Sequence, residues 1–201
     1  MTIKAPGPGD ALIVVDVQED FLPGGALGVP HGNGVVAPLN RLIDAWSERG
    51  LPVYVTRDWH PPNHCSFAAQ GGPWPEHCVA GTPGAEFAPE LHIPAGTTIV
   101  SKATNAQDEA YSVFKGTGLL QQLQAAGVKR VVLGGLATDY CVRFSGVDAR
   151  AAGLDVVILQ DGVCAVDVHT GDGERALREL AAAGAAMATS AELIAQLDSG
   201  R

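Results

Sequence analysis

Residues 131–141 read VVLGGLATDYC, an apolar run that passes through two glycines and ends in a cysteine. The run Val131–Leu133 is typical of a buried strand, and the residues from Tyr140 onward have the apolar spacing of a helix. Cys141 is therefore expected where a strand turns into a helix. The free N–H groups at the start of a helix favour negative charge, so they would lower the pKa of this thiol and could hold an oxyanion. On this stretch alone, a buried thiol that only fills space is the better interpretation.

Partners for that thiol follow two other apolar runs. Ile13–Val15 is followed by Asp16, and Ile99–Ser101 is followed by Lys102. In an open parallel sheet the carboxyl ends of the strands share one edge, where ligands bind. We therefore expect an acid, a cation and a nucleophile to meet at this edge, with Lys102 paired to Asp16 so that the group titrates near neutral pH. The alternative for Asp16 is a structural carboxylate that caps a helix or is ion-paired.

Short apolar runs alternate with longer segments of helical spacing along the rest of the chain. A glycine follows four of the helical segments, as a C′ residue does (Gly50, Gly127, Gly153, Gly184). This rhythm, with no internal repeat or linker, predicts one domain over residues 1–201, a three-layer α/β/α sandwich with a parallel sheet. Strands are expected at residues 11–16, 52–56, 98–101, 130–134, 155–160 and 185–188. Helices are expected at residues 35–49, 118–126, 140–152, 173–183 and 191–197.

The composition limits the class of protein. The 201 residues are 46% hydrophobic and carry a net charge of -9, which suits a globular domain and argues against binding to nucleic acid or to an anionic membrane. Residues 1–9 lack the apolar core of a signal peptide, and no apolar run reaches the ~18 residues that a membrane helix needs. The four cysteines form no C-x-x-C pair, so a zinc ribbon is excluded and reduced thiols in the cytoplasm are expected.

The segment 58–93 is different, because it is rich in Pro, Gly and His and has no sustained period. A loop of that length inside a compact domain is usually functional. Asp58 and His60 are two residues apart, so their side chains point the same way in an extended chain, and His77 can join them from across the loop. One carboxylate and two imidazoles suit Zn, Fe or Mn. For a lone D-x-H, surface histidines in a polar loop would be the better interpretation.

Several segments match the motifs of one family, in the family's own order: DVQEDF at 16–21, RDWHPPNH at 57–64, WPEHCVAGTPGA at 74–85, Lys102, AYSVF at 110–114 and GLATDYCV at 135–142. On these segments the chain resembles the nicotinamidases of the isochorismatase-like cysteine hydrolase family. The match covers nearly the whole chain, and the combination is specific although each segment alone is weak. One departure is Ala103, where the family usually has glycine.

The resemblance implies a six-stranded sheet of order 3-2-1-4-5-6. That order places Asp16 and Cys141 on either side of the crevice where the strand order reverses. The resemblance also implies hydrolysis of nicotinamide to nicotinate and ammonia through a cysteine thioester, in NAD salvage, with pyrazinamide as a further substrate. One divalent transition metal (Zn, Fe or Mn) would orient the pyridine ring.

The resemblance implies roles for individual residues as well. Asp16, Lys102 and Cys141 are catalytic, and the N–H groups of Ala137 and Cys141 hold the oxyanion, with a cis peptide bond before Ala137. Asp139 is expected to cap the helix that Cys141 enters. The aromatic residues around the substrate are Phe21, Trp74 and Tyr111. The metal ligands are Asp58, His60 and His77, with His64 and Ser66 as additional candidates.

Two alternatives stay open. Relatives in the same family act on ureido or carbamoyl compounds, although they often lack the ligand set of Asp58, His60 and His77. The other alternative is a catalytically silent metal-binding scaffold. The expected partner is a small-molecule substrate, with no nucleic acid and no membrane, and the sequence is compatible with a monomer or a homo-oligomer.

Overall fold

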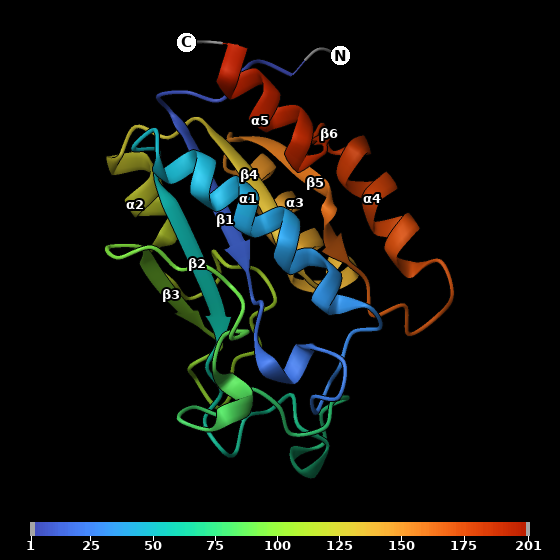
Figure 1. Ribbon diagram of the computed structural model, residues 1–201. Coiled ribbons are helices and arrows are strands. Elements are labelled where there is room, and N and C mark those ends of the chain that lie inside the picture. Colours follow the sequence, from blue (N-terminus) through green and yellow to red (C-terminus); the bar gives the residue numbers. More distant parts are fainter. Residues whose placement is uncertain (1–2, 200–201) are drawn as a thin grey trace.

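The computed structural model describes residues 3–199 and contains a six-stranded sheet whose neighbouring strands are all parallel. The strand order is β3-β2-β1-β4-β5-β6, as the resemblance implied. Helices cover both faces, so the expected three-layer α/β/α sandwich is confirmed (Figure 1). The expected domain limits, residues 1 and 201, lie outside the described residues. The strands are β1 (Asp10–Val15), β2 (Val53–Asp58), β3 (Thr98–Lys102), β4 (Arg130–Leu136), β5 (Asp155–Cys164) and β6 (Ala186–Ala188).

β1 lies in the middle of the sheet and is buried along its whole length. Its residues alternate between two cores, because successive side chains of a strand point to opposite faces. Leu12 and Val14 pack with residues of α1 and α5, whereas Ile13 and Val15 pack with residues of α2, α3 and α4. A continuous apolar run is what a parallel strand covered on both faces requires. The helices are α1 (Val36–Ser47), α2 (Leu119–Ala125), α3 (Arg143–Ala151), α4 (Asp172–Ala182) and α5 (Ser190–Ser199).

β4 approaches β1 closely where the two strands end. Gly135 pairs with Val15 and has φ +124°, and a Cβ on Gly135 would lie 2.0 Å from the carbonyl oxygen of Val15. Only glycine fits a backbone in that conformation at that distance. The close approach brings the chain that leads to Cys141 alongside the chain that leads to Asp16.

Some element boundaries differ from the sequence expectation. β2 continues to Asp58 and β5 to Cys164, past the expected ends at residues 56 and 160. The added residues are polar or irregularly paired, and their strand conformation comes from neighbours such as Lys102, which pairs with Asp58. The helix expected from residue 140 is preceded by a π-helical turn, η5 (Thr138–Val142). The four glycines expected to follow helices all have positive φ.

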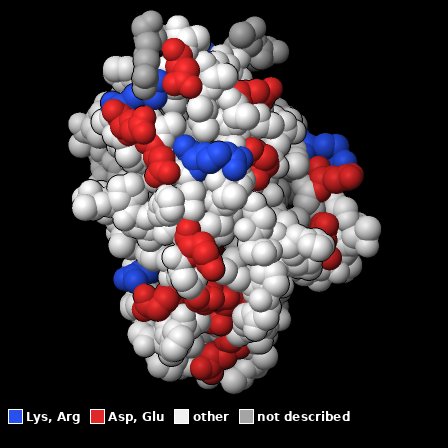
Figure 2. Space-filling view, viewed as in Figure 1, with Lys and Arg blue, Asp and Glu red and all other residues white. Residues whose placement is uncertain are grey.

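The long loop between β2 and β3 lies at the lower end of the molecule in Figure 1. Its regular structure, within residues 3–199, consists of two short 3₁₀ turns, η3 (Ala68–Gln70) and η4 (Pro83–Ala85). The turns η1 (Glu19–Phe21) and η2 (Gly32–Val35) follow β1. Acidic side chains gather over this loop-covered end in Figure 2, and basic ones are few there. No helix in the described part of the chain has the length and apolar character of a membrane span.

Candidate active site

Four buried side chains meet at the carboxyl ends of neighbouring strands. Asp58 and Lys102 are the last residues of β2 and β3, Asp16 follows β1 directly, and Cys141 lies in η5 after β4. Their exposed fractions are 5% for Asp58, 1% for Lys102, 0% for Asp16 and 5% for Cys141. The sequence predicted that three of them would meet, and the sheet brings Asp58 to the same place.

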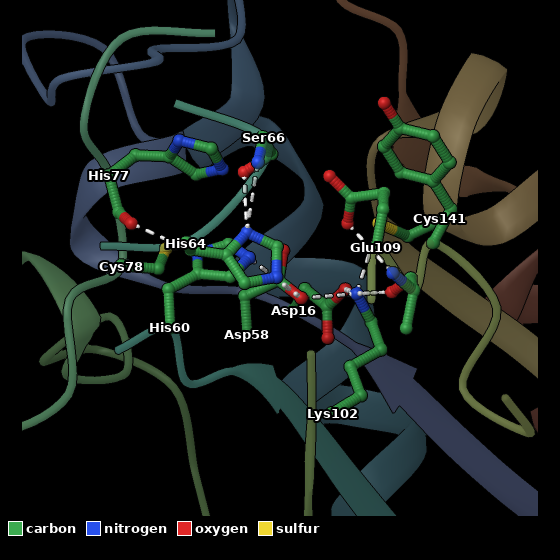
Figure 3. A network of polar contacts seen from close by, with 12 residues as sticks. Asp16, Asp58, His60, His64, Ser66, His77, Cys78, Lys102, Glu109 and Cys141 are labelled. Carbon is green, nitrogen blue, oxygen red and sulfur yellow. Dashed lines mark hydrogen bonds and ion pairs between the residues drawn. The ribbon is translucent and has the colours of Figure 1, made fainter. Parts of the chain in front are cut away.

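Lys102 lies at the centre of this group. Its Nζ is 3.0 Å from Asp16 Oδ2 and also donates to the carboxylate of Asp58. It further donates to the carbonyl oxygen of Ala110 at 3.0 Å and lies 3.4 Å from Cys141 Sγ. Figure 3 shows these contacts converging on the ammonium group. The buried cation therefore has the paired carboxylates that its desolvation requires.

Burial dominates the titration of this group. Burial raises the pKa of Cys141 well above its ordinary value, and the nearby Lys102 offsets this only in part. Burial likewise raises the pKa of Asp16, against the opposing effect of Lys102. Burial opposes the charge of Lys102, but Asp16 and Asp58 outweigh it and raise its pKa. The lowered thiol pKa expected from the sequence is therefore wrong, because desolvation exceeds the favourable local field. The thiolate needs a base.

Asp16 is placed to be that base. Thr56 Oγ1 donates to Asp16 Oδ1 at 2.6 Å, which fixes the carboxylate. A carboxylate oxygen of Asp16, one of Asp58 and Cys141 Sγ all lie within 4.8 Å of one another. Asp16 itself has φ +48°, a conformation that short polar side chains tolerate better than others. A proton on the thiol thus has a fixed carboxylate close by.

Backbone hydrogen bonds to Ala137 hold the turn that carries Cys141. The peptide bond between Leu136 and Ala137 is cis, as the resemblance implied. The carbonyl oxygen of Ala137 accepts hydrogen bonds from the N–H groups of Tyr140 and Val142, both at 3.1 Å. Ala137 and Cys141, the two residues expected to supply the oxyanion donors, line one pocket.

Asp139 does not cap the helix, contrary to the sequence expectation. Its two carboxylate oxygens accept hydrogen bonds from the backbone N–H groups of Val166 (3.0 Å) and Asp167 (2.9 Å). The side chain points instead to the loop after the neighbouring strand β5 and accepts from two of its N–H groups. Asp139 therefore fastens the loop that contains Val166 to the turn that contains Cys141.

Asp58, His60 and His77 form a cluster with the chemistry of a metal site. One possible ligand atom from each lies within 4.8 Å of the other two, and all three residues are buried. His60 Nδ1 donates to the carbonyl oxygen of His77 at 3.0 Å, and His77 Nδ1 donates to that of Pro75 at 2.7 Å. These bonds leave the Nε2 atoms of His60 and His77 available to bind a metal ion, an arrangement common among metal-binding histidines.

His60 Nε2 is the clearest sign that the cluster fits a metal ion. It is buried and has no hydrogen-bond partner among residues 3–199. Burial lowers the pKa of His60 to about 3, and the neighbouring His77 adds to this effect. The imidazole is therefore neutral and its lone pair is available. A buried acceptor without a partner costs free energy unless a ligand meets it.

His64 and Ser66 lie beside this cluster but do not belong to it. His64 Nδ1 is 2.7 Å from Ser66 Oγ, so these two side chains engage each other. Both are buried, at 0% and 3% exposed. Cys78 packs in the hydrophobic core that contains α1.

A small pocket opens beside Cys141. The three aromatic residues expected around the substrate, Phe21, Trp74 and Tyr111, line it. Its volume of about 30 Å³ holds roughly two water molecules. Trp74 Nε1 donates to the hydroxyl of Tyr111 at 2.9 Å, so the two aromatic walls are joined. The remaining lining residues are Leu27, Asp58, His77, Ala137, Tyr140, Cys141 and Val166.

Gln18 is a site residue that the sequence analysis missed. Its Oε1 accepts from the N–H of Asp58 at 2.8 Å, and its Nε2 donates to the carbonyl oxygens of Asp58 (2.8 Å) and Ala85 (2.9 Å). The side chain is fully buried. The amide therefore fixes the strand end that carries Asp58. Its place in the motif DVQEDF, just after Asp16, was the only signal.

Comparison with known proteins gives a consistent result. A family model described as the isochorismatase domain matches residues 10–192. A nicotinamidase of Escherichia coli is 38% identical over 206 residues, covering 92% of this chain and 97% of the relative. The crystal structure of a pyrazinamidase of Pyrococcus horikoshii in complex with zinc has a TM-score of 0.87 at 48% identity, covering 90% of this chain and 99% of that chain. The crystal structure of PnC1 from L. infantum in complex with nicotinate has a TM-score of 0.86 at 36% identity, covering 96% and 98%.

Proposed function

This chain belongs to the isochorismatase family, and from that membership and its site we propose that it hydrolyses nicotinamide to nicotinate and ammonia, in NAD salvage. One observation carries the proposal. Cys141, which contacts the buried Lys102, lines an aromatic pocket together with Asp58 and His77 of the metal-type cluster. The nucleophile Cys141 and two of the residues that could hold a metal ion for the pyridine nitrogen thus line the same pocket. Pyrazinamide, which also carries a carboxamide on a nitrogen heterocycle, is proposed as a further substrate.

The first half of the reaction forms a thioester. Asp16 takes the proton from Cys141 Sγ, and the thiolate attacks the carboxamide carbon. The raised pKa of Asp16 makes it a stronger base than an ordinary aspartate. The N–H groups of Ala137 and Cys141 hold the oxyanion. The C–N bond then breaks, and Asp16 returns the proton to the leaving ammonia.

The second half releases the product. Asp16 takes a proton from a water molecule, whose oxygen attacks the thioester carbonyl. The C–S bond breaks and the proton held by Asp16 returns to Cys141. The product leaves as the carboxylic acid, which loses its proton to solvent to give nicotinate. Lys102 keeps its charge throughout, because its pKa is raised, and stabilises whichever of Asp16 and Cys141 is anionic.

Asp58, His60 and His77 would hold one divalent transition metal, and the unpartnered Nε2 of His60 supports this assignment. When bound, such an ion supplies a Lewis acid that a pyridine nitrogen can ligate. Phe21, Trp74 and Tyr111 contact the faces and edge of the ring, and Leu27, Tyr140 and Val166 complete the apolar lining. We place the reaction in the cytoplasm, since a thiol nucleophile needs a reducing compartment.

Ammonia release from a matched set of amides, on protein of measured metal content, tests the proposal. We expect turnover of nicotinamide and pyrazinamide, little of benzamide, and none of an N-carbamoyl amino acid. Faster release from the carbamoyl compound would favour the other amidohydrolases of the family. No release from any of them at saturating Zn²⁺, Fe²⁺ or Mn²⁺ would favour a silent scaffold.

A further inference from the structure

Asp20 lies close to the site but takes no part in the steps above. It belongs to the turn η1 and directly precedes the pocket residue Phe21. Both oxygens of its carboxylate accept hydrogen bonds from backbone N–H groups, Oδ2 from Cys78 at 2.7 Å and Oδ1 from Ala26 at 3.3 Å. The shorter of these two bonds joins η1 to the loop that carries His77.

The backbone of Cys78 has an unusual conformation, with φ +47°. A residue other than glycine keeps such a conformation only where its surroundings fix it. The N–H of Cys78 donates to Asp20, and its carbonyl oxygen accepts from the N–H of His60 at 2.9 Å. Its side chain is fully buried. Asp20 therefore supplies one of the contacts that fix the residue directly after His77.

Among the three candidate metal ligands, His77 depends most on this turn. Asp58 is the last residue of β2 and His60 follows it closely, whereas His77 lies in the irregular chain between η3 and η4. The imidazole of His77 packs against the ring of Phe21, with the ring centroids 5.7 Å apart. The turn η1 thus contacts this part of the loop twice, through the ring of Phe21 and through the carboxylate of Asp20.

Gly84 of η4 leaves room for the carboxylate of Asp20. A Cβ on Gly84 would lie 2.1 Å from Asp20 Oδ2 and 2.3 Å from Oδ1. Both distances are far shorter than a van der Waals contact, so any larger residue would displace the carboxylate from the N–H of Cys78. The carboxylate is therefore held between η4 and the backbone of Cys78.

We propose that Asp20 is a positioning residue that acts through His77. Its carboxylate fixes the backbone of Cys78 and thereby holds the imidazole of His77 within reach of Asp58 and His60. A residue that orients a ligand in this way raises the affinity for a metal ion without touching the ion. This inference rests on the metal-binding part of the proposed function.

Equilibrium dialysis of Co²⁺ against folded variants tests this role, with circular dichroism as the check on folding. Asp20→Ala removes the acceptor, so the Kd for Co²⁺ should rise about tenfold or more. Asp20→Asn keeps a carbonyl oxygen for the N–H of Cys78, so its Kd should stay within about threefold of the wild-type value. Glu19→Ala, which removes the neighbouring carboxylate of η1, is the matched control and should change the Kd by no more than about twofold.

The reactivity of Cys141 separates positioning of His77 from a general loosening of the fold. Alkylation by iodoacetamide is followed on the peptide that contains Cys141 by mass spectrometry, at equal metal content. Asp20→Ala should keep the wild-type rate, because the change reaches His77 and leaves the nucleophile in place. A rate changed by more than about threefold would give Asp20 a general structural role instead.

Gly84→Ala tests the same contact without removing the carboxylate, and it decides the question if Asp20→Ala does not fold. The added Cβ should push the carboxylate away from the N–H of Cys78 and raise the Kd for Co²⁺ about tenfold. Gly34→Ala is the matched control, because a Cβ on Gly34 would meet no atom within 4 Å.

Equal Kd values for Asp20→Ala and Glu19→Ala, or for the two glycine variants, would overturn the positioning role. Ammonia release from nicotinamide by the wild type is measured separately. A wild type that hydrolyses nicotinamide, beside variants and controls that bind Co²⁺ alike, would reject the role of Asp20 and leave the proposed function standing.

Discussion

Lys102 is fully buried, and two carboxylates and a thiol surround its ammonium group. Because burial raises the pKa of both Asp16 and Cys141, the resting site keeps a proton on the thiol instead of a preformed thiolate. Catalysis at this scale depends on the transfer of one proton between two side chains fixed against a single cation. The protonation state of the site is therefore set by Asp16, Lys102 and Cys141 together and not by any one of these residues.

The raised pKa of Asp16 sets the expected pH dependence. Asp16 must be unprotonated to accept the thiol proton, so kcat/KM should fall as the pH drops through its pKa. Because burial raises that pKa, the loss should begin at a higher pH than for an ordinary aspartate. The measurement is kcat/KM for nicotinamide against pH, with circular dichroism to exclude acid unfolding. A profile that stays flat down to the ordinary carboxyl range, in folded protein, would contradict the account.

Gln18→Ala should weaken the metal site without touching a ligand. The change leaves the buried N–H and C=O of Asp58 without partners, at about 1–3 kcal/mol for each group left unsatisfied. We expect a lower thermal midpoint and a metal Kd raised about 10–100-fold, measured by dialysis on folded protein. Gln70→Ala, at an exposed glutamine of η3, is the matched control. A metal Kd equal to that of the control would remove Gln18 from the site.

At the scale of elements, the sequence predicted what hydrophobic periodicity governs. β1 and β4 are continuous apolar runs, and their ends placed Asp16 and Cys141 at one edge of the sheet. Side-chain hydrogen bonds to backbone groups at the ends of neighbouring strands could not be predicted in this way. Asp139 and Gln18 bind backbone groups far away in sequence. The expectation of a lowered pKa for Cys141 was wrong because the burial of the thiol depends on the whole fold. The sheet order and the residue roles came from the resemblance, not from periodicity.

Asp139→Ala tests the link between η5 and the loop after β5. Without the carboxylate, the N–H groups of Val166 and Asp167 lose their acceptor, and Val166 is no longer fixed at the wall of the pocket. KM for nicotinamide should rise about tenfold, with a smaller fall in kcat, because substrate contacts suffer more than the nucleophile. Asp155→Asn, at the exposed start of β5, is the control. A fall in kcat alone would contradict the assigned positioning role.

At the scale of the whole molecule, the strand order places the two halves of the site. β2 and the loop after it supply Asp58, His60 and His77, and β4 leads to Cys141, with β1 between them. Lys102 at the end of β3 connects the two sides by contacting Asp58 and Cys141. The hydrogen bond from Trp74 to Tyr111 joins two walls of the pocket that lies between them.

His77→Ala should separate ring positioning from chemistry. If the metal-type cluster orients the ring, kcat/KM for nicotinamide should fall about 10–100-fold, because remote binding energy supports orientation at the reacting carbon. Benzamide lacks the ring nitrogen, so it should be a poor substrate of the wild type and lose little more in the variant. Alkylation of Cys141 by iodoacetamide should be unchanged. Equal losses of kcat/KM for nicotinamide and benzamide would contradict the role of the cluster in orienting the ring.

The central claim is that Cys141 carries out the hydrolysis of nicotinamide, and the most direct measurement is ammonia release by wild type and Cys141→Ala at equal metal content. The account predicts that the wild type releases ammonia and nicotinate in equal amounts, whereas the variant still binds nicotinamide with kcat lowered at least about 1000-fold. Cys141→Ser should be nearly as inactive, since Asp16 is too weak a base for an alcohol. A Cys141→Ala variant that kept more than about a few per cent of the wild-type kcat would contradict the covalent mechanism.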